Sequence, residues 1–272
     1  MGERFPLSLS AVNVVCFKLD WDMKTLNVLL IKRNISPHNN KWSLPGGFIQ
    51  GDETLEEAAI RIFAKETGIA PKYINQFRSY SDTSRDKRLV NNEKIRVITT
   101  SFIAIYTSTD EPILTHESLD YDWFKVPRRY VQRSIPPLAF DHDQILLDAS
   151  NRLRINLEYQ GLATRFLSDY FTLGEIQDVY EIIWEVELDP ANFRDKLTNI
   201  DGWIKEVKNP PEELEPRRGK PPTWYKEQDI PQFERIISNP NGAVLREKEL
   251  EYQKDLDNIT TEIPIIDIEI KE

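Results

Sequence analysis

Apolar and polar positions alternate along the first part of the chain in the manner of β-strands, and one helical period interrupts them. Two β-branched runs at residues 11–19 and 26–31 flank a polar turn at residues 20–22, which predicts a β-hairpin. This mixture predicts an α/β unit over residues 1–150. The pattern also predicts a Pro-, Asn- and Gly-rich loop at residues 34–51, strands at 73–80, 95–107 and 122–126, and a helix at 142–155.

The helix predicted at residues 54–67 has clear ends in the sequence. Thr54 and Glu57 have the spacing of a capping box, and Gly68 supplies a C-terminal stop. One face of the helix is apolar at helical spacing, which predicts that this face packs against the core. Its members are Leu55, Ala58, Ala59, Ile62 and Phe63.

A second group of elements follows residue 150. Asp189 and Pro190 have the types expected at the start of a helix, and Thr172 with Glu175 has capping-box spacing. Three short helices followed by a two-stranded ribbon is the order of a winged helix-turn-helix, which predicts such a domain over residues 151–227. The helices are predicted at residues 161–170, 173–184 and 189–200, the ribbon at 203–207 and 223–226, and a strand-like piece at 260–270.

The chain is acidic overall, but its charge is unevenly distributed. Its 272 residues carry 35 Lys and Arg against 45 Asp and Glu. Residues 1–150 hold 19 charges of each sign, residues 151–226 hold 11 positive and 14 negative charges, and residues 227–272 hold 5 and 12. A net charge of −10 argues against overall electrostatic attraction to nucleic acid, but it is compatible with a local basic binding surface. Residues 228–272 are an acidic tail of unassigned role.

The few cysteines and histidines limit which disulfide or metal sites the protein can contain. A single cysteine excludes an internal disulfide framework, and Cys16 lies in an apolar run, which predicts a buried thiol. His38, His116 and His142 fall in separate elements, so we expect no metal site built on them, and we expect His142 to cap or pack at its helix start. No stretch approaches the roughly 18 apolar residues of a membrane span. We therefore expect a cytoplasmic protein without a membrane partner.

One segment has a specific spacing of glycines and charges. Gly46 and Gly47 are followed by Glu53, Arg61 and a closing Glu-x-Gly-Ile at residues 66–69, and the preceding residues read Trp-Ser-Leu-Pro. This pattern resembles the Nudix box. The resemblance implies a Nudix-like α/β/α sandwich with a mixed sheet. In Nudix hydrolases the helix carries carboxylates at positions i, i+3 and i+4, and these hold Mg²⁺ against substrate phosphates.

The sequence departs from this pattern at the metal site. The three positions are Ile62, Lys65 and Glu66, so their charge changes from −3 to 0. A lysine repels a bound cation, and the repulsion energy of two unit charges 4 Å apart at partial burial is about 4 kcal/mol. We therefore expect no cofactor, and we assign no catalytic residue. Mg²⁺, with Glu66 as a ligand, is expected only if the chain is a hydrolase that recruits carboxylates from elsewhere. Glu53 and Arg61, the rest of the residual box, are expected to pair.

A degenerate Nudix box followed by a winged helix resembles the Nudix-related transcriptional regulators over about residues 8–227. The likeness also includes residues 140–142, 171–181 and 192–197, and an Arg-Asp-x-Arg element at residues 85–88. The resemblance implies a recognition helix at residues 189–200, a wing near residues 217–221, and an effector that is ADP-ribose or a sugar or sugar phosphate. It predicts effector contacts by Trp42, Gly46, Gly47, Glu66, Arg85, Asp86 and Arg88.

The predicted recognition helix divides into two faces. Phe193, Leu197 and Ile200 take the core, which leaves polar residues facing outward. Asn and Arg are side chains that read adenine and guanine in the major groove, and a cationic hairpin tip suits phosphate contacts. The predicted DNA contacts are Asn192, Arg194, Lys196 and Thr198 on the helix and Arg217, Arg218 and Lys220 in the wing.

These observations favour a ligand-responsive transcriptional regulator. A palindromic operator requires a two-fold protein, so we expect a homodimer whose partners are operator DNA and a small-molecule effector. The alternative from another class is a Mg²⁺-dependent Nudix hydrolase acting on ADP-ribose-like nucleoside diphosphate compounds. A third hypothesis is a protein-interaction module.

Overall fold

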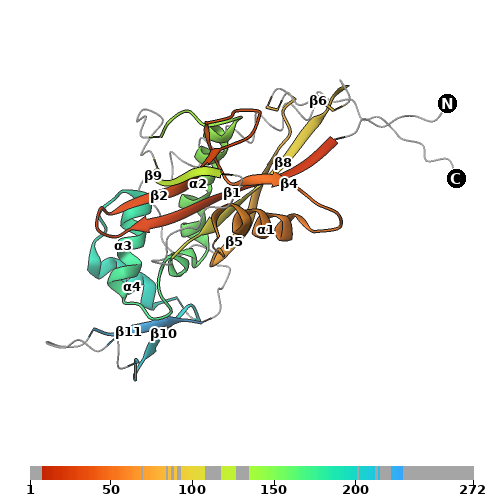
Figure 1. The fold of residues 1–272 in the computed structure, drawn as a ribbon. Helices are drawn as coiled ribbons and strands as arrows, with labels where there is room; N and C mark the ends of the chain where they lie inside the picture. Colours follow the sequence, from red (N-terminus) through yellow and green to blue (C-terminus); the bar gives the residue numbers. More distant parts are fainter. Residues whose placement is uncertain are drawn as a thin grey trace, which may run out of the picture.

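The computed structural model describes residues 8–68, 70–83, 85–86, 89–90, 93–107, 118–126, 135–200, 202–211, 214 and 222–228. Two domains lie one after the other along this part of the chain (Figure 1). The strands are β1 (Ser8–Asp20), β2 (Thr25–Arg33), β3 (Trp42–Ser43), β4 (Gly46–Phe48), β5 (Tyr73–Tyr80), β6 (Leu89–Val90), β7 (Glu93–Lys94), β8 (Arg96–Ile105), β9 (Ser118–Lys125), β10 (Ile204–Val207) and β11 (Trp224–Glu227). The helices are α1 (Leu55–Thr67), α2 (His142–Tyr159), the 3₁₀ helix η1 (Leu162–Phe166), α3 (Leu173–Trp184) and α4 (Pro190–Thr198).

A mixed seven-stranded sheet forms the first domain. β1 and β8 are parallel neighbours, and β5 pairs antiparallel with β8. β1 and β2 form the predicted antiparallel hairpin. In its turn the backbone N–H of Met23 donates to Asp20 Oδ1 at 2.9 Å, which shows why a polar turn residue stands between two apolar runs.

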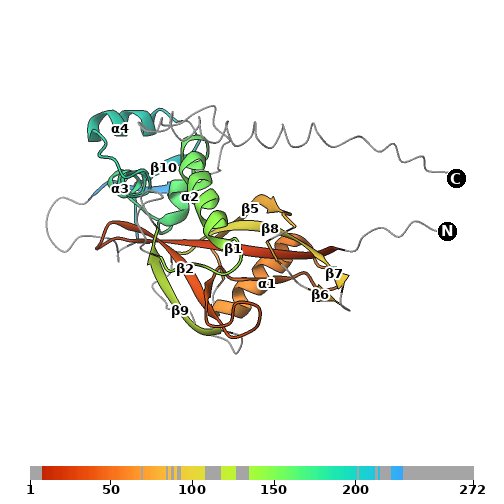
Figure 2. The same cartoon turned by 90° about the horizontal axis from the view of Figure 1, so that it is seen from above.

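The sheet lies between α1 on one face and α2 on the other (Figure 2). Because side chains alternate along a strand, β1 supplies both cores. Val14 and Cys16 pack in the cluster that contains Phe63 of α1, whereas Val15 and Phe17 pack in the cluster that contains α2. The predicted α/β/α sandwich with a mixed sheet is confirmed, and Cys16 is buried as predicted.

The second domain contains η1, α3, α4 and the antiparallel ribbon of β10 and β11. Trp203, fully buried, precedes β10, and a β-bridge joins Phe171 to Tyr225 of β11. The apolar core of this domain is continuous with the α2 side of the sheet. The three-helix-plus-ribbon order of a winged helix is therefore confirmed.

Several predicted elements differ from the structure in their bounds. The helix predicted at residues 161–170 is wrong beyond Phe166, because the chain must extend for Phe171 to pair with Tyr225, whose two backbone hydrogen bonds measure 3.0 and 2.7 Å. α2 continues to Tyr159, so the domain boundary predicted at residue 150 falls inside a helix. The loop predicted at residues 34–51 contains the short strands β3 and β4. The predicted strand at residues 260–270 lies outside the described residues.

Candidate functional site

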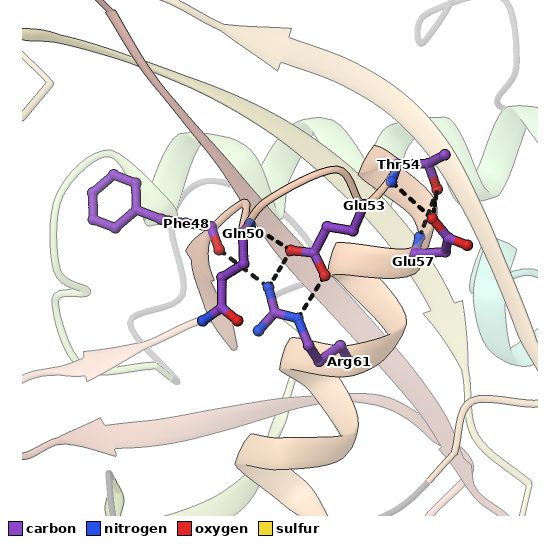
Figure 3. Close-up of polar contacts among 6 residues, drawn as sticks. All are labelled: Phe48, Gln50, Glu53, Thr54, Glu57 and Arg61. Atoms are coloured by element: carbon purple, nitrogen blue, oxygen red, sulfur yellow. Dashed lines mark hydrogen bonds and ion pairs between the residues drawn. The ribbon is translucent and has the colours of Figure 1, made fainter.

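The glycine-containing loop leads into α1 through a complete capping box. Thr54 Oγ1 accepts a hydrogen bond from the Glu57 backbone N–H at 3.2 Å, and Glu57 Oε2 accepts one from the Thr54 N–H at 2.8 Å (Figure 3). The bond from the Thr54 backbone N–H, together with one from the Thr54 hydroxyl, lowers the pKa of the Glu57 carboxyl below its usual value. Gly68 ends the helix in the left-handed conformation at φ 70°. The two ends predicted from sequence are confirmed.

Glu53 and Arg61 hold the loop against the helix. Arg61 Nε donates to Glu53 Oε2 at 2.7 Å, and the other end of the guanidinium donates to Glu53 Oε1 and to the carbonyl of Phe48 (Figure 3). Glu53 also accepts from the backbone N–H of Gln50 at 2.7 Å. The hydrogen bonds from Arg61 lower the pKa of Glu53. The predicted pairing is confirmed, and it fixes the shape of the loop.

A cavity of about 320 Å³ opens where this loop, α1 and the start of α2 meet. Such a volume lies within the range of small-molecule sites. Of the predicted effector residues, Gly46, Gly47, Glu66, Arg85 and Asp86 line it. Other lining residues, which are not among the predicted effector contacts, include Asn13, Arg33, Ile35, Gln50, Thr99 and Phe140.

Two predicted effector residues are not placed at the cavity. Trp42 is not among the described lining residues; it packs edge-on against Phe124 with ring centroids 5.0 Å apart. Trp42 therefore packs within the sheet, and its contact with an effector stays a prediction. Arg88 lies outside the described residues.

The three positions that carry carboxylates in Nudix hydrolases all line the cavity here. Ile62 is 4% exposed and packs in the α1 core, and a Cβ on Gly47 would lie 3.2 Å from its Cδ1. Lys65 is exposed and Glu66 is 7% exposed. In the described part of the chain, no group of three or more Asp, Glu, His or Cys residues could hold a metal ion. These side chains do not fit a Nudix metal centre.

Arg85 joins the cavity wall to the start of α2. Its guanidinium donates to both carboxylate oxygens of Asp141 at 2.8 Å and also to Thr99 Oγ1. The Arg85 side chain is only 5% exposed. A bidentate, nearly buried pair of this kind fixes direction as well as distance. The loop that carries Arg85 and Asp86 therefore rests on the N-cap residue of α2.

His142, the first residue of α2, is buried against the same cavity. Its Nδ1 accepts the backbone N–H of Leu44 at 3.0 Å, and its Nε2 lies 3.2 Å from the side-chain amide of Asn13. Burial lowers the pKa of His142 to about 3, so the ring is neutral at pH 7. His142 thus packs at the helix start, as predicted, and ties α2 to β1.

The far end of α2 contacts the winged helix directly. Arg154 Nε donates to the carbonyl of Ile183 at 3.2 Å, and Trp184 Nε1 donates to the carbonyl of Arg154 at 3.0 Å. Tyr180 adds a hydrogen bond from its hydroxyl to the carbonyl of Leu157 at 3.0 Å. One helix therefore extends from the cavity to α3.

α4 has the two faces predicted for a recognition helix. Asp189 caps it by accepting the Asn192 backbone N–H at 2.8 Å. Thr198 Oγ1 donates to the carbonyl of Arg194 at 3.0 Å, which makes it a weaker candidate for a base contact. Phe193 and Leu197 are buried, Ile200 is partly buried, and Asn192, Arg194, Lys196 and Thr198 are exposed. The predicted wing contacts Arg217, Arg218 and Lys220 lie outside the described residues.

Comparisons with known proteins agree with this arrangement. Residues 9–147 match the model of the NUDIX domain, and residues 163–226 match that of the NrtR DNA-binding winged helix domain. The chain is 30% identical over 195 residues to the ADPR responsive transcriptional repressor NtrR of Acinetobacter baylyi, across 71% of this chain and 73% of that protein. It is 34% identical over 125 residues to an ADP-ribose pyrophosphatase of Methanocaldococcus jannaschii, across 46% of this chain and 66% of that protein.

The fold is also that of a solved regulator. Crystal structures of Shewanella oneidensis NrtR, alone and complexed with a 27mer DNA, superpose with a TM-score of 0.65 at 27% and 26% identity. Each match covers 85% of this chain and all of that chain. A Nudix domain joined to a winged helix defines a class of transcriptional regulators. The chain belongs to the Nudix-related transcriptional regulators of the NrtR type.

The helices of the structure bear on the prediction that the chain has no membrane span. Within the described residues, no helix combines the length and the apolar character that crossing a bilayer requires.

Proposed function

We propose that this protein is an ADP-ribose-responsive transcriptional regulator. Its Nudix cavity binds the effector without hydrolysing it, and its winged helix binds operator DNA as part of a cytoplasmic homodimer. The observation that carries the proposal is the cavity at the degenerate Nudix helix, which α2 joins to the winged helix.

The cavity favours an anionic, partly polar ligand. Arg33, Lys65 and Arg85 bring cationic groups to its wall, and Ile35 and Phe140 add apolar surface. This combination suits a ligand with phosphates and an adenine. Two relatives carry ADP-ribose in their names, one as a repressor and one as a pyrophosphatase. Both names favour ADP-ribose over a simple sugar.

Absence of hydrolysis is proposed from the side chains at the three box positions. The hydrocarbon of Ile62 contacts the glycine loop, where a hydrolase holds a metal-binding carboxylate. Lys65 adds a positive charge, so Glu66 is the one carboxylate left of the three. The hydrolase alternative requires metal ligands from another part of the chain.

Effector binding is proposed to reach DNA through α2. Arg85 and His142 both line the cavity. Arg85 binds Asp141, the N-cap residue of α2, and His142 is the first residue of that helix. The last turns of α2 hydrogen-bond to α3, which packs against α4. In a homodimer, a small change in the tilt of α2 would alter the spacing of the two recognition helices on a palindromic site.

Replacing Arg194 by Ala is expected to weaken sequence-specific DNA binding by about 1–3 kcal/mol, because an exposed recognition-helix arginine reads base edges. Fluorescence anisotropy with operator and scrambled DNA measures the effect. Lys41→Ala removes the same charge from an exposed site in the Nudix domain and is the matched control. Equal losses in both variants, or on both DNAs, would contradict the assigned role.

Asp141→Asn is expected to reduce the effect of ADP-ribose on DNA affinity while ADP-ribose still binds. The substitution removes the ion pair between Arg85 and the α2 N-cap, and Asp141 is not itself a lining residue of the cavity. The measurement is the ratio of DNA dissociation constants with and without ADP-ribose, for which couplings of about 5- to 150-fold are typical. Asp178→Asn is the control, because it removes an exposed ion pair between α3 and Lys24 of the β1–β2 turn. A wild-type ratio in Asp141→Asn would exclude this route.

A further inference from the structure

We infer that Lys65 replaces the divalent metal of the Nudix site as the counter-charge for the effector's pyrophosphate, so that effector binding is independent of metal. The inference rests on the proposed function and adds the recognition chemistry of that site. Its basis is the disagreement between the helix residues and a metal centre.

The geometry places Lys65 where the metal-binding group of a hydrolase would be. Ile62, Lys65 and Glu66 follow the i, i+3, i+4 spacing on α1, and all three line the same cavity. Ile62 is directed into the core, whereas Lys65 is exposed. The lysine thus combines a place in the cavity wall with a long, flexible stem that ends in a compact charge, which suits contact with a phosphate oxygen.

The charges of the two arrangements are nearly equivalent for an anionic ligand. Three carboxylates with one Mg²⁺ carry a combined charge of −1, whereas Ile62, Lys65 and Glu66 sum to zero. The formal charge of these positions is therefore less negative without a metal than in a hydrolase with one, which favours an anionic ligand. The same substitutions remove the ligands that would bind the metal.

The arginines of the cavity wall bind groups of the protein itself. Arg61 holds Glu53, and Arg85 holds Asp141. Arg33 donates from Nε to the carbonyl of Pro37 at 3.0 Å. Each of these guanidiniums is tied to the shape of the cavity. Lys65 adds an exposed cation to the same wall, at a helix position where a hydrolase has a metal ligand.

Isothermal titration of the full chain with ADP-ribose tests the inference, in buffer with EDTA and in buffer with Mg²⁺. Wild-type affinity is expected to agree within about twofold between the two buffers. Lys65→Ala is expected to lose about tenfold in both, as for a lost charge-assisted contact. Lys65→Arg should recover most of the loss, and Lys65→Glu should bind worst in EDTA and regain affinity with Mg²⁺. Lys41→Ala, exposed and outside the described cavity lining, should bind like the wild type.

The outcomes separate this inference from the proposed function. Wild-type binding that disappears in EDTA, or a Lys65→Ala variant that binds like the wild type, would overturn the role of Lys65 while leaving the effector in place. No binding of ADP-ribose by the wild type in either buffer would overturn the proposed effector and this inference together. Thermal unfolding of each variant checks that the exposed substitutions leave the fold intact.

Discussion

Acidification below about pH 6.5 is expected to destabilise the protein, with His142 as a main cause. Burial lowers the pKa of this imidazole to about 3 in the folded protein, whereas an exposed histidine titrates near 6.5. The unfolded chain therefore takes up a proton that the folded chain excludes, so the stabilisation is full above pH 6.5 and falls as the pH drops toward 3. One proton gives about 1.4 kcal/mol per pH unit, or roughly 2–3 kcal/mol between pH 6.5 and 4.5. Urea unfolding at several pH values measures this slope.

The variant His142→Gln isolates this effect. Glutamine retains an oxygen that can accept the Leu44 N–H but has no proton to gain, so we expect a lower free energy of unfolding at pH 7 and a flatter pH dependence. His38, in the loop after β2, is the comparison: desolvation lowers its pKa as well, but its side chain is partly exposed whereas His142 is buried. His38→Gln should retain most of the wild-type slope. An unchanged slope in His142→Gln would show that other groups cause the acid sensitivity.

Trp203→Ala is expected to cost about 3–5 kcal/mol of unfolding free energy, the range for truncating a buried large aromatic residue. Trp203 is fully buried, and its indole lies so close to Gly161 that a Cβ there would come 2.3 Å from Nε1. Its carbonyl accepts the Gln228 N–H at 2.8 Å, so it also anchors the ribbon of the winged helix. Chemical denaturation gives the stability change, and DNA binding should be lost with it.

Trp21→Ala is the control for the loss of an indole. Trp21 lies in the β1–β2 turn and is 42% exposed, so its removal should change stability by less than about 1 kcal/mol. Similar losses in the two variants would contradict the packing role assigned to Trp203.

Local signals predicted most of the secondary structure correctly. The N-terminal ends of α1 and α3 depend on capping boxes that span four residues, Thr54 to Glu57 and Thr172 to Glu175, so local sequence is enough to place them. The helix predicted at residues 161–170 failed for the opposite reason. Its end is decided by the β-bridge from Phe171 to Tyr225, whose partner lies 54 positions further along the chain.

The candidate site was predictable only where it lies within one motif. The departure from the Nudix metal-ligand pattern is visible in the sequence at Ile62 and Lys65, and the structure shows Ile62 packed beside Gly47. The part of the cavity wall formed by β1 and the start of α2 could not be predicted from the sequence. Asn13 and His142 are 129 positions apart, and no local pattern indicates that β1 and α2 meet at the cavity.

The most direct test of the central claim is a titration of the DNA complex with ADP-ribose, combined with chromatography of the nucleotide afterwards. The full chain and a labelled DNA fragment from upstream of its gene are used at low salt in the presence of Mg²⁺. We predict a sequence-specific complex whose DNA affinity changes at least about fivefold with ADP-ribose, while the ADP-ribose remains intact. No specific complex, or a complex indifferent to ADP-ribose together with steady release of AMP, would contradict the account and favour a hydrolase.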